Sequence, residues 1–215
     1  MTVNDDAPTP TPSGLFIAFE GGDGVGKSTQ VALLADQLRE HGRDVIVTRE
    51  PGDSRIGPQV RQMLLDGDEL DARAEALLFA ADRADHVVSV IGPALRRGAV
   101  VITDRYVDSS IAYQGVGRGL GTTEVAALSE FATRGLNPDL TIVLDLSAAE
   151  RRRRMGNLER FDRIERAPEQ MHDDVRRTFL DLAAAHPERY LVVDAARPPD
   201  VVAAEIAAAV EKVNT

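Results

Sequence analysis

The sequence predicts a three-layer α/β fold in which helices cover both faces of a five-stranded parallel sheet. Short apolar segments alternate with helical patterns along the chain, and this alternation is typical of right-handed βαβ crossovers. The apolar segments run continuously instead of alternating with polar residues, as expected of strands that are buried on both faces. A glycine-rich turn follows the first segment directly, and ligands of open α/β sheets bind at that edge.

Five segments are predicted to be strands because each is short and rich in apolar or β-branched residues. They cover residues 15–19, 44–48, 99–103, 140–144 and 190–193.

Helical patterns fill the spaces between the strands. After the first strand, Val31, Leu34, Ala35 and Leu38 recur at helical spacing, and Gly42 follows as a stop. The other helical patterns cover residues 56–65, 71–97 with a break near Gly92-Pro93, 122–133, 148–155, 168–185 and 199–213.

The length of 215 residues suits one domain, which we predict over residues 14–215. Residues 1–13 are rich in Asp, Pro and Thr without apolar periodicity, so we expect a disordered tail. This tail lacks the basic and apolar regions of a signal peptide. No apolar run approaches the roughly 18 residues that a membrane span requires. We therefore expect a cytoplasmic protein with no membrane partner.

Charge and cysteine content exclude several classes of function. The net charge of −10 argues against a nucleic-acid partner. The absence of cysteine excludes disulfide scaffolds, zinc–cysteine sites and thiol catalysis. One segment, residues 150–166, holds seven arginines against four acidic residues. A local basic segment on an acidic protein suits a compact polyanion.

The strongest motif fits G-x-x-x-x-G-K-[ST], lies between a strand and a helix, and predicts a phosphate-binding P-loop. Its backbone N–H groups and the helix N-terminus favour a phosphate. We expect Lys27 to bridge the β- and γ-phosphates and Ser28 to bind Mg²⁺. The candidate residues for the nucleoside triphosphate are Gly21, Gly22, Asp23, Gly24, Val25, Gly26, Lys27, Ser28 and Thr29.

Other features narrow the class of P-loop protein. The chain contains no N-K-x-D motif for reading guanine, and it is too short for a motor or large ATPase. A kinase for a small phosphorylated acceptor fits best.

Charged residues at two further strand ends support a kinase site. Asp104 and Arg105 end the third strand, where the carboxylate can orient Mg²⁺ and the guanidinium can hold an anionic oxygen. Arg49 ends the second strand and offers another cation.

Several segments, in order along the chain, resemble those of thymidylate kinases. Phe-Ala-Ala-Asp-Arg and Tyr-Gln-Gly are more specific than the P-loop, and the resemblance covers residues 14–213. The matching segments are residues 19–29, 48–52, 77–84, 104–106, 109–110, 112–115 with 117–119, 138–140 with 144–145, and 162–165.

The resemblance implies a P-loop kinase that transfers the γ-phosphoryl group of ATP to dTMP in dTTP synthesis, giving dTDP and ADP. It also implies Mg²⁺ as cofactor, ATP and dTMP as ligands, and a homodimer packed through helices such as 71–90 and 122–133.

For the nucleoside of dTMP, the resemblance implies a pocket of five side chains. Phe79 would stack on thymine and Arg83, one helical turn further, would donate to its O4. Ser110 and Gln114 would lie near the base, and Tyr113 would lie under the deoxyribose.

For the phosphate and the metal, the resemblance assigns Arg49 and Arg105 to the acceptor phosphate. Asp23 matches the carboxylate near the 3′-hydroxyl and the metal, where it would join Ser28 and Asp104.

The resemblance also implies that residues 150–166 form a lid that supplies catalytic arginines. Gly24 occupies the P-loop position where some relatives carry an arginine. We predict that Arg154, Arg160 and Arg163 close onto ATP and act with Lys27 and Arg105. No chemistry is assigned to the histidines, which are His41, His86, His172 and His186.

Two alternatives stay open. One is a kinase for another nucleoside monophosphate or for a deoxynucleoside. The other is a P-loop protein that binds nucleotides without catalysis.

Overall fold

The computed structural model describes residues 14–156, 164 and 168–213. The predicted tail, residues 1–13, lies outside this range, as do Arg160 and Arg163 of the predicted lid.

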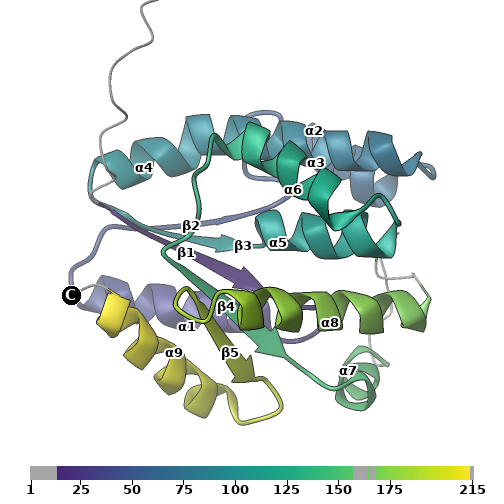
Figure 1. The fold of residues 1–215 in the computed structure, drawn as a ribbon. Coiled ribbons are helices and arrows are strands. Elements are labelled where there is room, and N and C mark those ends of the chain that lie inside the picture. The colour runs from purple at the N-terminus through teal and green to yellow at the C-terminus, as the bar shows by residue number, and fades with distance from the viewer. Residues whose placement is uncertain (1–13, 157–163, 165–167, 214–215) are drawn as a thin grey trace, which may run out of the picture.

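The predicted five-stranded parallel sheet is confirmed. Its strands lie in the order β2-β3-β1-β4-β5, and every neighbouring pair is parallel (Figure 1). The strands are β1 (Leu15–Glu20), β2 (Val45–Arg49), β3 (Val100–Asp104), β4 (Leu140–Asp145) and β5 (Tyr190–Asp194). Because β1 is central, the P-loop that follows it emerges between the two halves of the sheet.

Helices cover both faces of the sheet, as predicted. One face carries α1 and α9, and the other carries α3, α4 and α8, with α6 packed against α3 (Figure 1). The helical segments are α1 (Lys27–Glu40), α2 (Gly57–Arg61), η1 (Gln62–Asp66), α3 (Ala72–His86), η2 (Val87–Ile91), α4 (Gly92–Arg96), α5 (Val107–Ser110), η3 (Ile111–Gly117), α6 (Thr122–Thr133), α7 (Ala148–Met155), α8 (Glu169–Ala185) and α9 (Pro199–Val213). No helix in the described part of the chain is long and apolar enough to cross a membrane.

The hydrophobic core is divided between the two faces. Phe19 of β1 packs with α1 and α9, whereas Phe16 faces η2, α4 and the ring of Tyr106. The three inner strands β1, β3 and β4 are buried on both faces, which explains their continuous apolar sequence, whereas Val47 of β2 and Val192 of β5 are exposed because these strands lie at the edges. Burial of large apolar side chains stabilises the fold by about 25 cal/mol per Å².

The predicted break at Gly92-Pro93 is wrong. The helix continues from α3 through the π-helical turn η2 into α4. Pro93 lies in the first turn of α4, where its missing N–H costs little. A Cβ on Gly92 would lie 2.9 Å from the Val87 carbonyl oxygen, so glycine is needed where the wide turn meets α4.

The helical segment from α5 through η3 was missed by the sequence analysis. It includes a π-helical stretch, whose residues do not repeat at the 3.6-residue period used to predict helices. This segment positions Ser110, Tyr113 and Gln114.

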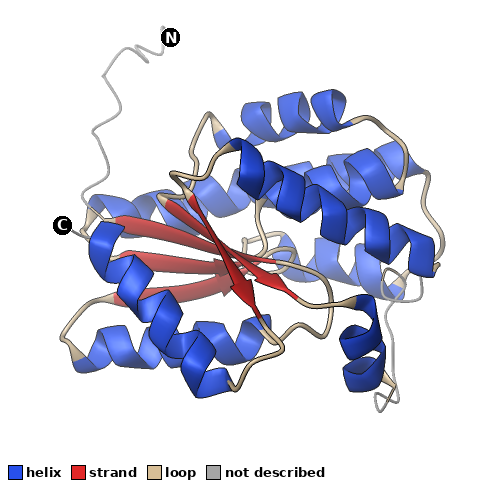
Figure 2. Cartoon of the chain, turned by 60° about the horizontal axis from the view of Figure 1, so that its bottom comes forward, coloured by secondary structure: helices blue, strands red, loops and turns tan. Residues whose placement is uncertain are grey.

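The carboxyl ends of the strands meet at one edge of the sheet, on the side of α7 (Figure 2). Register aligns Arg49 with Asp104 across β2 and β3, so the charged ends of these strands lie next to the P-loop.

Candidate active site

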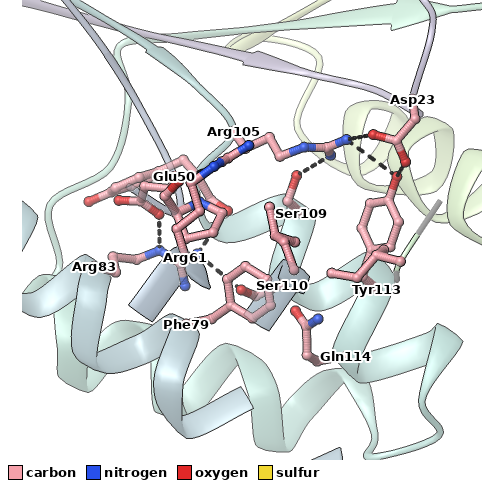
Figure 3. Close-up of a pocket in the computed structure, with 14 residues that line it drawn as sticks. Asp23, Glu50, Arg61, Phe79, Arg83, Arg105, Ser109, Ser110, Tyr113 and Gln114 are labelled. Atoms are coloured by element: carbon pink, nitrogen blue, oxygen red, sulfur yellow. Dashed lines mark hydrogen bonds and ion pairs between the residues drawn. The ribbon is translucent and has the colours of Figure 1, made fainter. Parts of the chain in front are cut away.

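A cavity of about 160 Å³ opens beside the P-loop. The P-loop, the β2–α2 connection, α3, the segment after β3 and residue Ile164 form its walls (Figure 3). Seven predicted acceptor-site residues line it: Asp23, Phe79, Arg83, Arg105, Ser110, Tyr113 and Gln114. The structure thus brings together side chains that lie up to 91 positions apart in the sequence.

Arg105 links the P-loop to this cavity. Its Nη2 donates to Asp23 Oδ1, and its Nη1 donates to Ser109 Oγ at 3.0 Å (Figure 3). The Tyr113 hydroxyl donates to Asp23 Oδ2 at 3.0 Å, and the guanidinium lies over the Tyr113 ring, 5.1 Å from its centroid. One cation, one carboxylate and one phenol therefore form a fixed cluster at the mouth of the P-loop.

Burial and neighbouring charges shift the pKa values of Asp23 and Arg105 in opposite directions. Burial opposes the charge on Asp23, but Arg105 and then Lys27 hold the pKa of this carboxyl below its ordinary value. Burial also opposes the charge on Arg105, but Tyr113 and Asp23 hold the pKa of the guanidinium well above its ordinary value. Both groups are charged at neutral pH, so the cluster presents a fixed cation to an anionic ligand.

The backbone of Arg105 is left-handed, with φ of +72°. This conformation is uncommon for a residue with a Cβ. The Arg105 N–H donates to the Phe19 carbonyl at 2.9 Å, and the Glu20 carboxylate accepts from Tyr106 N and Ser109 N at 2.9 and 3.2 Å. Bonds to β1 therefore hold the turn that aims Arg105 at the P-loop.

One end of the cavity contains Phe79 and Arg83 on α3, one helical turn apart as predicted. Phe79 is half-buried and its ring lies in the wall of the cavity (Figure 3). Arg83 is 1% exposed, and its Nη2 donates to Ser110 Oγ at 3.0 Å and to the Tyr106 carbonyl at 3.1 Å. A flat ring beside a fixed donor suits a heterocycle with an acceptor on its edge.

Gln114 lies near the same end but is already engaged. Its Nε2 donates to Glu75 Oε1 at 2.9 Å, and Arg118 pairs with the same carboxylate. Its amide orientation is therefore fixed by protein contacts, and the Oε1 remains as the acceptor available to a ligand.

The P-loop has the geometry expected of its motif. Gly26, with φ of +100°, precedes α1 and allows the turn that leads into the helix. Lys27 begins α1, and its Nζ donates to the Gly21 and Gly22 carbonyls at 3.1 and 2.7 Å. Burial is the largest cause of a lowered pKa for Lys27, followed by the charge of Arg105, whereas Asp104 and Asp23 favour the ammonium.

The Ser28 and Asp104 side chains meet below the P-loop in a way that suits a magnesium ion. Ser28 Oγ lies 3.4 Å from Asp104 Oδ2, and Asp104 Oδ1 is buried without a hydrogen-bond partner among the described residues. Such an oxygen fits a hard cation, which takes few protein ligands when phosphates and water complete its shell. The described residues gather no group of three or more His, Cys, Asp or Glu side chains that could hold a metal.

On the other side of the P-loop, Arg154 of α7 crosses to the nucleotide-binding edge. Its Nη1 donates to the Val25 carbonyl at 3.2 Å and its Nη2 to the Ala195 carbonyl at 2.7 Å. It thereby borders a hollow of about 130 Å³ that also contacts Gly26 and Thr29. Of the predicted lid arginines, Arg154 is the one within the described residues, and it lies beside the P-loop.

One predicted residue lies apart from the cavity. Arg49 is more than half exposed and pairs with Asp53 at 3.6 Å, and it is absent from the described residues that line the cavity. Its assignment to the acceptor phosphate stays a prediction. Arg61 of α2 lines the cavity instead, and its Nη1 donates to the Pro51 carbonyl at 2.8 Å.

Sequence reasoning missed Arg61 and the buried carboxylates Glu20 and Glu50. Arg61 ends the short helix α2, and no charge pattern singles it out in the sequence. Glu20 and Glu50 each end or follow a strand at the sheet edge, and this position was the one available signal.

A P-loop next to a cavity with a ring, a fixed donor and a cluster of cations defines a P-loop kinase for a small nucleotide. The family model described as thymidylate kinase matches residues 19–206. The chain belongs to the thymidylate kinase family. Its reaction is transfer of the γ-phosphoryl group of ATP to dTMP, giving dTDP and ADP.

Individual relatives agree with this assignment over almost their whole length. The chain is 56% identical to a thymidylate kinase of Clavibacter sepedonicus, over 91% of this chain and 94% of that protein. It is 48% identical to one of Deinococcus radiodurans, over 93% and 97% of the two chains. A crystal structure of thymidylate kinase from Ehrlichia chaffeensis matches with a TM-score of 0.77 and 33% identity, over 93% of this chain and all of that one.

Proposed function

We propose that the cavity of about 160 Å³ is the dTMP site and that the P-loop side holds ATP. The observation that carries this proposal is the position of Arg105, which joins Asp23 of the P-loop to the wall of the cavity. A phosphate held by Arg105 would lie between the nucleoside pocket and the triphosphate loop. Such an arrangement supports direct transfer between two bound nucleotides.

The reaction needs charge neutralisation more than proton transfer, because a phosphate oxygen of dTMP is already anionic. Two unit charges 4 Å apart repel by about 4 kcal/mol at an effective dielectric of about 20. Lys27 on the ATP side and Arg105 on the dTMP side offset this repulsion in our proposal, and Arg61 adds a third cation to the cavity wall.

For the nucleoside, we propose that Phe79 stacks on thymine and that Arg83 donates to its O4. Ser110 and Gln114 lie near the base edge. We also propose that the Tyr113 ring, which its bond to Asp23 holds in place, lies under the deoxyribose and crowds a 2′-hydroxyl.

Mg²⁺ bound to the triphosphate would neutralise phosphate charge during transfer. We propose Ser28 and Asp104 as its protein ligands, on the grounds of the partnerless Asp104 oxygen. Asp23 is the third predicted ligand, although Arg105 and Tyr113 already engage both of its oxygens.

We further propose that residues 14–215 form a single kinase domain whose residues 150–166 act as the lid. The lining of the dTMP cavity by Ile164 supports this. In this view Arg154 lies over ATP, and Arg160 and Arg163 close onto it as the resemblance implies. We also propose a homodimer packed through α3 and α6, located in the cytoplasm where ATP and dTMP are held.

A coupled assay of ADP release tests the dTMP assignment. The wild-type enzyme is assayed with ATP and, in turn, dTMP, dUMP, dCMP, dGMP and thymidine. We expect the highest kcat/KM with dTMP. A higher kcat/KM with another monophosphate or with thymidine would identify that compound as the acceptor in place of dTMP. Binding of ATP without release of ADP in the presence of any acceptor would favour the nucleotide-binding alternative.

A further inference from the structure

Four buried side chains form a continuous hydrogen-bonded series behind the base-binding end of the cavity. Thr48 Oγ1 lies 2.6 Å from His86 Nε2, and His86 Nδ1 lies 2.8 Å from Glu50 Oε1. Glu50 Oε2 accepts from Arg83 Nε at 2.7 Å. None of the four residues is more than 4% exposed. The series therefore ends on the guanidinium that faces the base.

The ion pair with Arg83 fixes the proton on His86. A carboxylate paired with a guanidinium accepts hydrogen bonds and does not donate them. His86 Nδ1 must then carry the proton that it donates to Glu50 Oε1. Thr48 holds the other ring nitrogen, while its hydroxyl also lies 3.4 Å from Asp53 Oδ2. His86 is thus locked from both sides, in a single ring orientation.

Locking His86 in turn limits how Glu50 can bind Arg83. A carboxylate beside a guanidinium favours two parallel hydrogen bonds, one from each oxygen. Here the bond from His86 to Oε1 fixes the rotation of the Glu50 carboxylate, and in this orientation Arg83 pairs with Oε2 through Nε. The Nη groups of Arg83 stay directed at Ser129, Ser110 and the Tyr106 carbonyl.

The number of N–H bonds on Arg83 shows how many donors remain for a ligand. Arg83 carries five N–H bonds, and the hydrogen bonds to the described residues use one at Nε, one at Nη1 and two at Nη2. One N–H on Nη1 is left for a ligand. A two-bond pair with Glu50 would draw the guanidinium toward the carboxylate and away from the cavity.

We infer that His86 is a positioning residue for base recognition: by holding one oxygen of Glu50, it keeps the Arg83 guanidinium in the cavity wall, where the remaining Nη1 N–H is available to the base. This inference rests on the proposed role of Arg83 as the donor to the C4 oxygen of thymine. Cytosine carries an amino group at C4, which cannot accept from Arg83. His86 therefore contributes to the selection of dTMP over dCMP, although it does not touch the nucleotide.

Two substitutions at His86 test the inference. In His86→Leu the Glu50 carboxylate loses the bond that fixes its rotation and can turn to accept from two nitrogens of Arg83, so the carboxylate stays satisfied while the guanidinium shifts. His86→Asn replaces the Nδ1 donor with an amide N–H and should restore most of the selectivity. Ser54→Ala is the matched control, because it removes a buried hydrogen bond between the same loop and Asp82 of α3 without touching Arg83.

Steady-state kinetics with dTMP, dUMP and dCMP provide the readout. Loss of a hydrogen bond to a charged donor reduces binding about tenfold to a hundredfold. For His86→Leu we expect the KM for dTMP and dUMP to rise together about tenfold, because both bases carry the C4 oxygen. The selectivity for dTMP over dCMP should fall about tenfold, and the KM for ATP should stay within about twofold.

Thr48→Val keeps the shape of Thr48 and removes its hydroxyl, so it tests the inference if His86→Leu does not fold. Like His86→Leu, Thr48→Val should lower the selectivity for dTMP over dCMP, here by about threefold. Unchanged selectivity in the folded His86 and Thr48 variants would overturn the inference, as would an equal loss in Ser54→Ala. If the wild-type enzyme does not favour dTMP over dCMP, the proposed function fails instead.

Discussion

Glu20 reaches Arg105 through a single intermediary, Ser109. Its Oε2 accepts from Ser109 Oγ at 2.6 Å, and the same hydroxyl accepts from Arg105 Nη1 at 3.0 Å. Burial raises the pKa of Glu20 to about 7, and the nearby charge of Asp108 acts in the same direction. The surroundings of this carboxyl thus make its ionisation costly although three donors contact it.

The raised pKa of Glu20 makes the stability of the protein depend on pH. Between about pH 4.5 and 7 the folded state retains a proton that the unfolded chain releases, so stability falls as the pH rises and levels off above 7. The contribution is at most about 3 kcal/mol. Denaturant unfolding at a series of pH values should show this fall, and Glu20→Gln should flatten it. Exposed Glu40→Gln serves as control, and parallel curves for wild type and Glu20→Gln would contradict the assignment.

At the scale of residues, the sequence predicts contacts between side chains that are close together in the chain better than contacts between side chains that are far apart in it. Phe79 and Arg83 share one helical turn, so their common pocket follows from helix geometry. Glu50 and His86 lie 36 positions apart and meet because β2 leads into a turn beside α3. No spacing rule reports such a meeting, and His86 was left without a role for that reason.

At the scale of elements, the regular helices and strands were predicted to within about two residues, and α6, α7 and α9 match their predicted bounds. The π-helical segments η1 and η2 fall in the helices predicted over residues 56–65 and 71–97, whereas η3 was not predicted, because its widened turns depart from helical periodicity. Tertiary contacts with α8 and α6 hold η3 in place. Together, α5 and η3 deliver Ser110, Tyr113 and Gln114 to the cavity, so local propensity fails at the site itself.

Helix α7 reaches the P-loop through Arg154. Because this side chain binds carbonyls of both the P-loop and the segment after β5, we expect Arg154→Ala to lower kcat/KM for ATP tenfold or more. Steady-state kinetics at saturating dTMP measure the effect. Arg153→Ala is the control, because Arg153 is 73% exposed and pairs with Glu150 in its own helix. Equal kinetics for the two variants would remove Arg154 from the ATP site.

For the whole molecule, the alternation of strands and helices was sufficient to predict the parallel sheet with helices on both faces. The order of the strands was not predicted, because it depends on how crossovers pack and not on local pattern. Large apolar side chains are exposed on the outer helices α3 and α6. Sequence periodicity alone cannot distinguish such exposed residues from residues that pack inside the protein. Phe131 on α6 is 85% exposed and Leu77 on α3 is 57% exposed.

These exposed side chains lead to a prediction about assembly. If the homodimer packs through α3 and α6, Phe131→Asp should convert it to a monomer, because a buried charge opposes association. Sedimentation velocity at matched concentrations measures the change. Val201→Asp is the control, since Val201 is 44% exposed on α9 across the sheet. A monomeric wild-type protein, or a dimer that survives Phe131→Asp, would contradict this interface.

The assignment of the cavity to dTMP is tested most directly by steady-state kinetics of Phe79→Ala with both substrates varied. Phe79 is a better probe than Arg83, whose loss would leave Glu50 buried without its cation. Stacking of a base on an aromatic ring contributes about 1–3 kcal/mol. We therefore expect the KM for dTMP to rise about tenfold to a hundredfold, while the KM for ATP stays within about twofold and exposed Leu77→Ala behaves as wild type. A Phe79→Ala enzyme whose ATP constant rises while its dTMP constant holds would contradict the account.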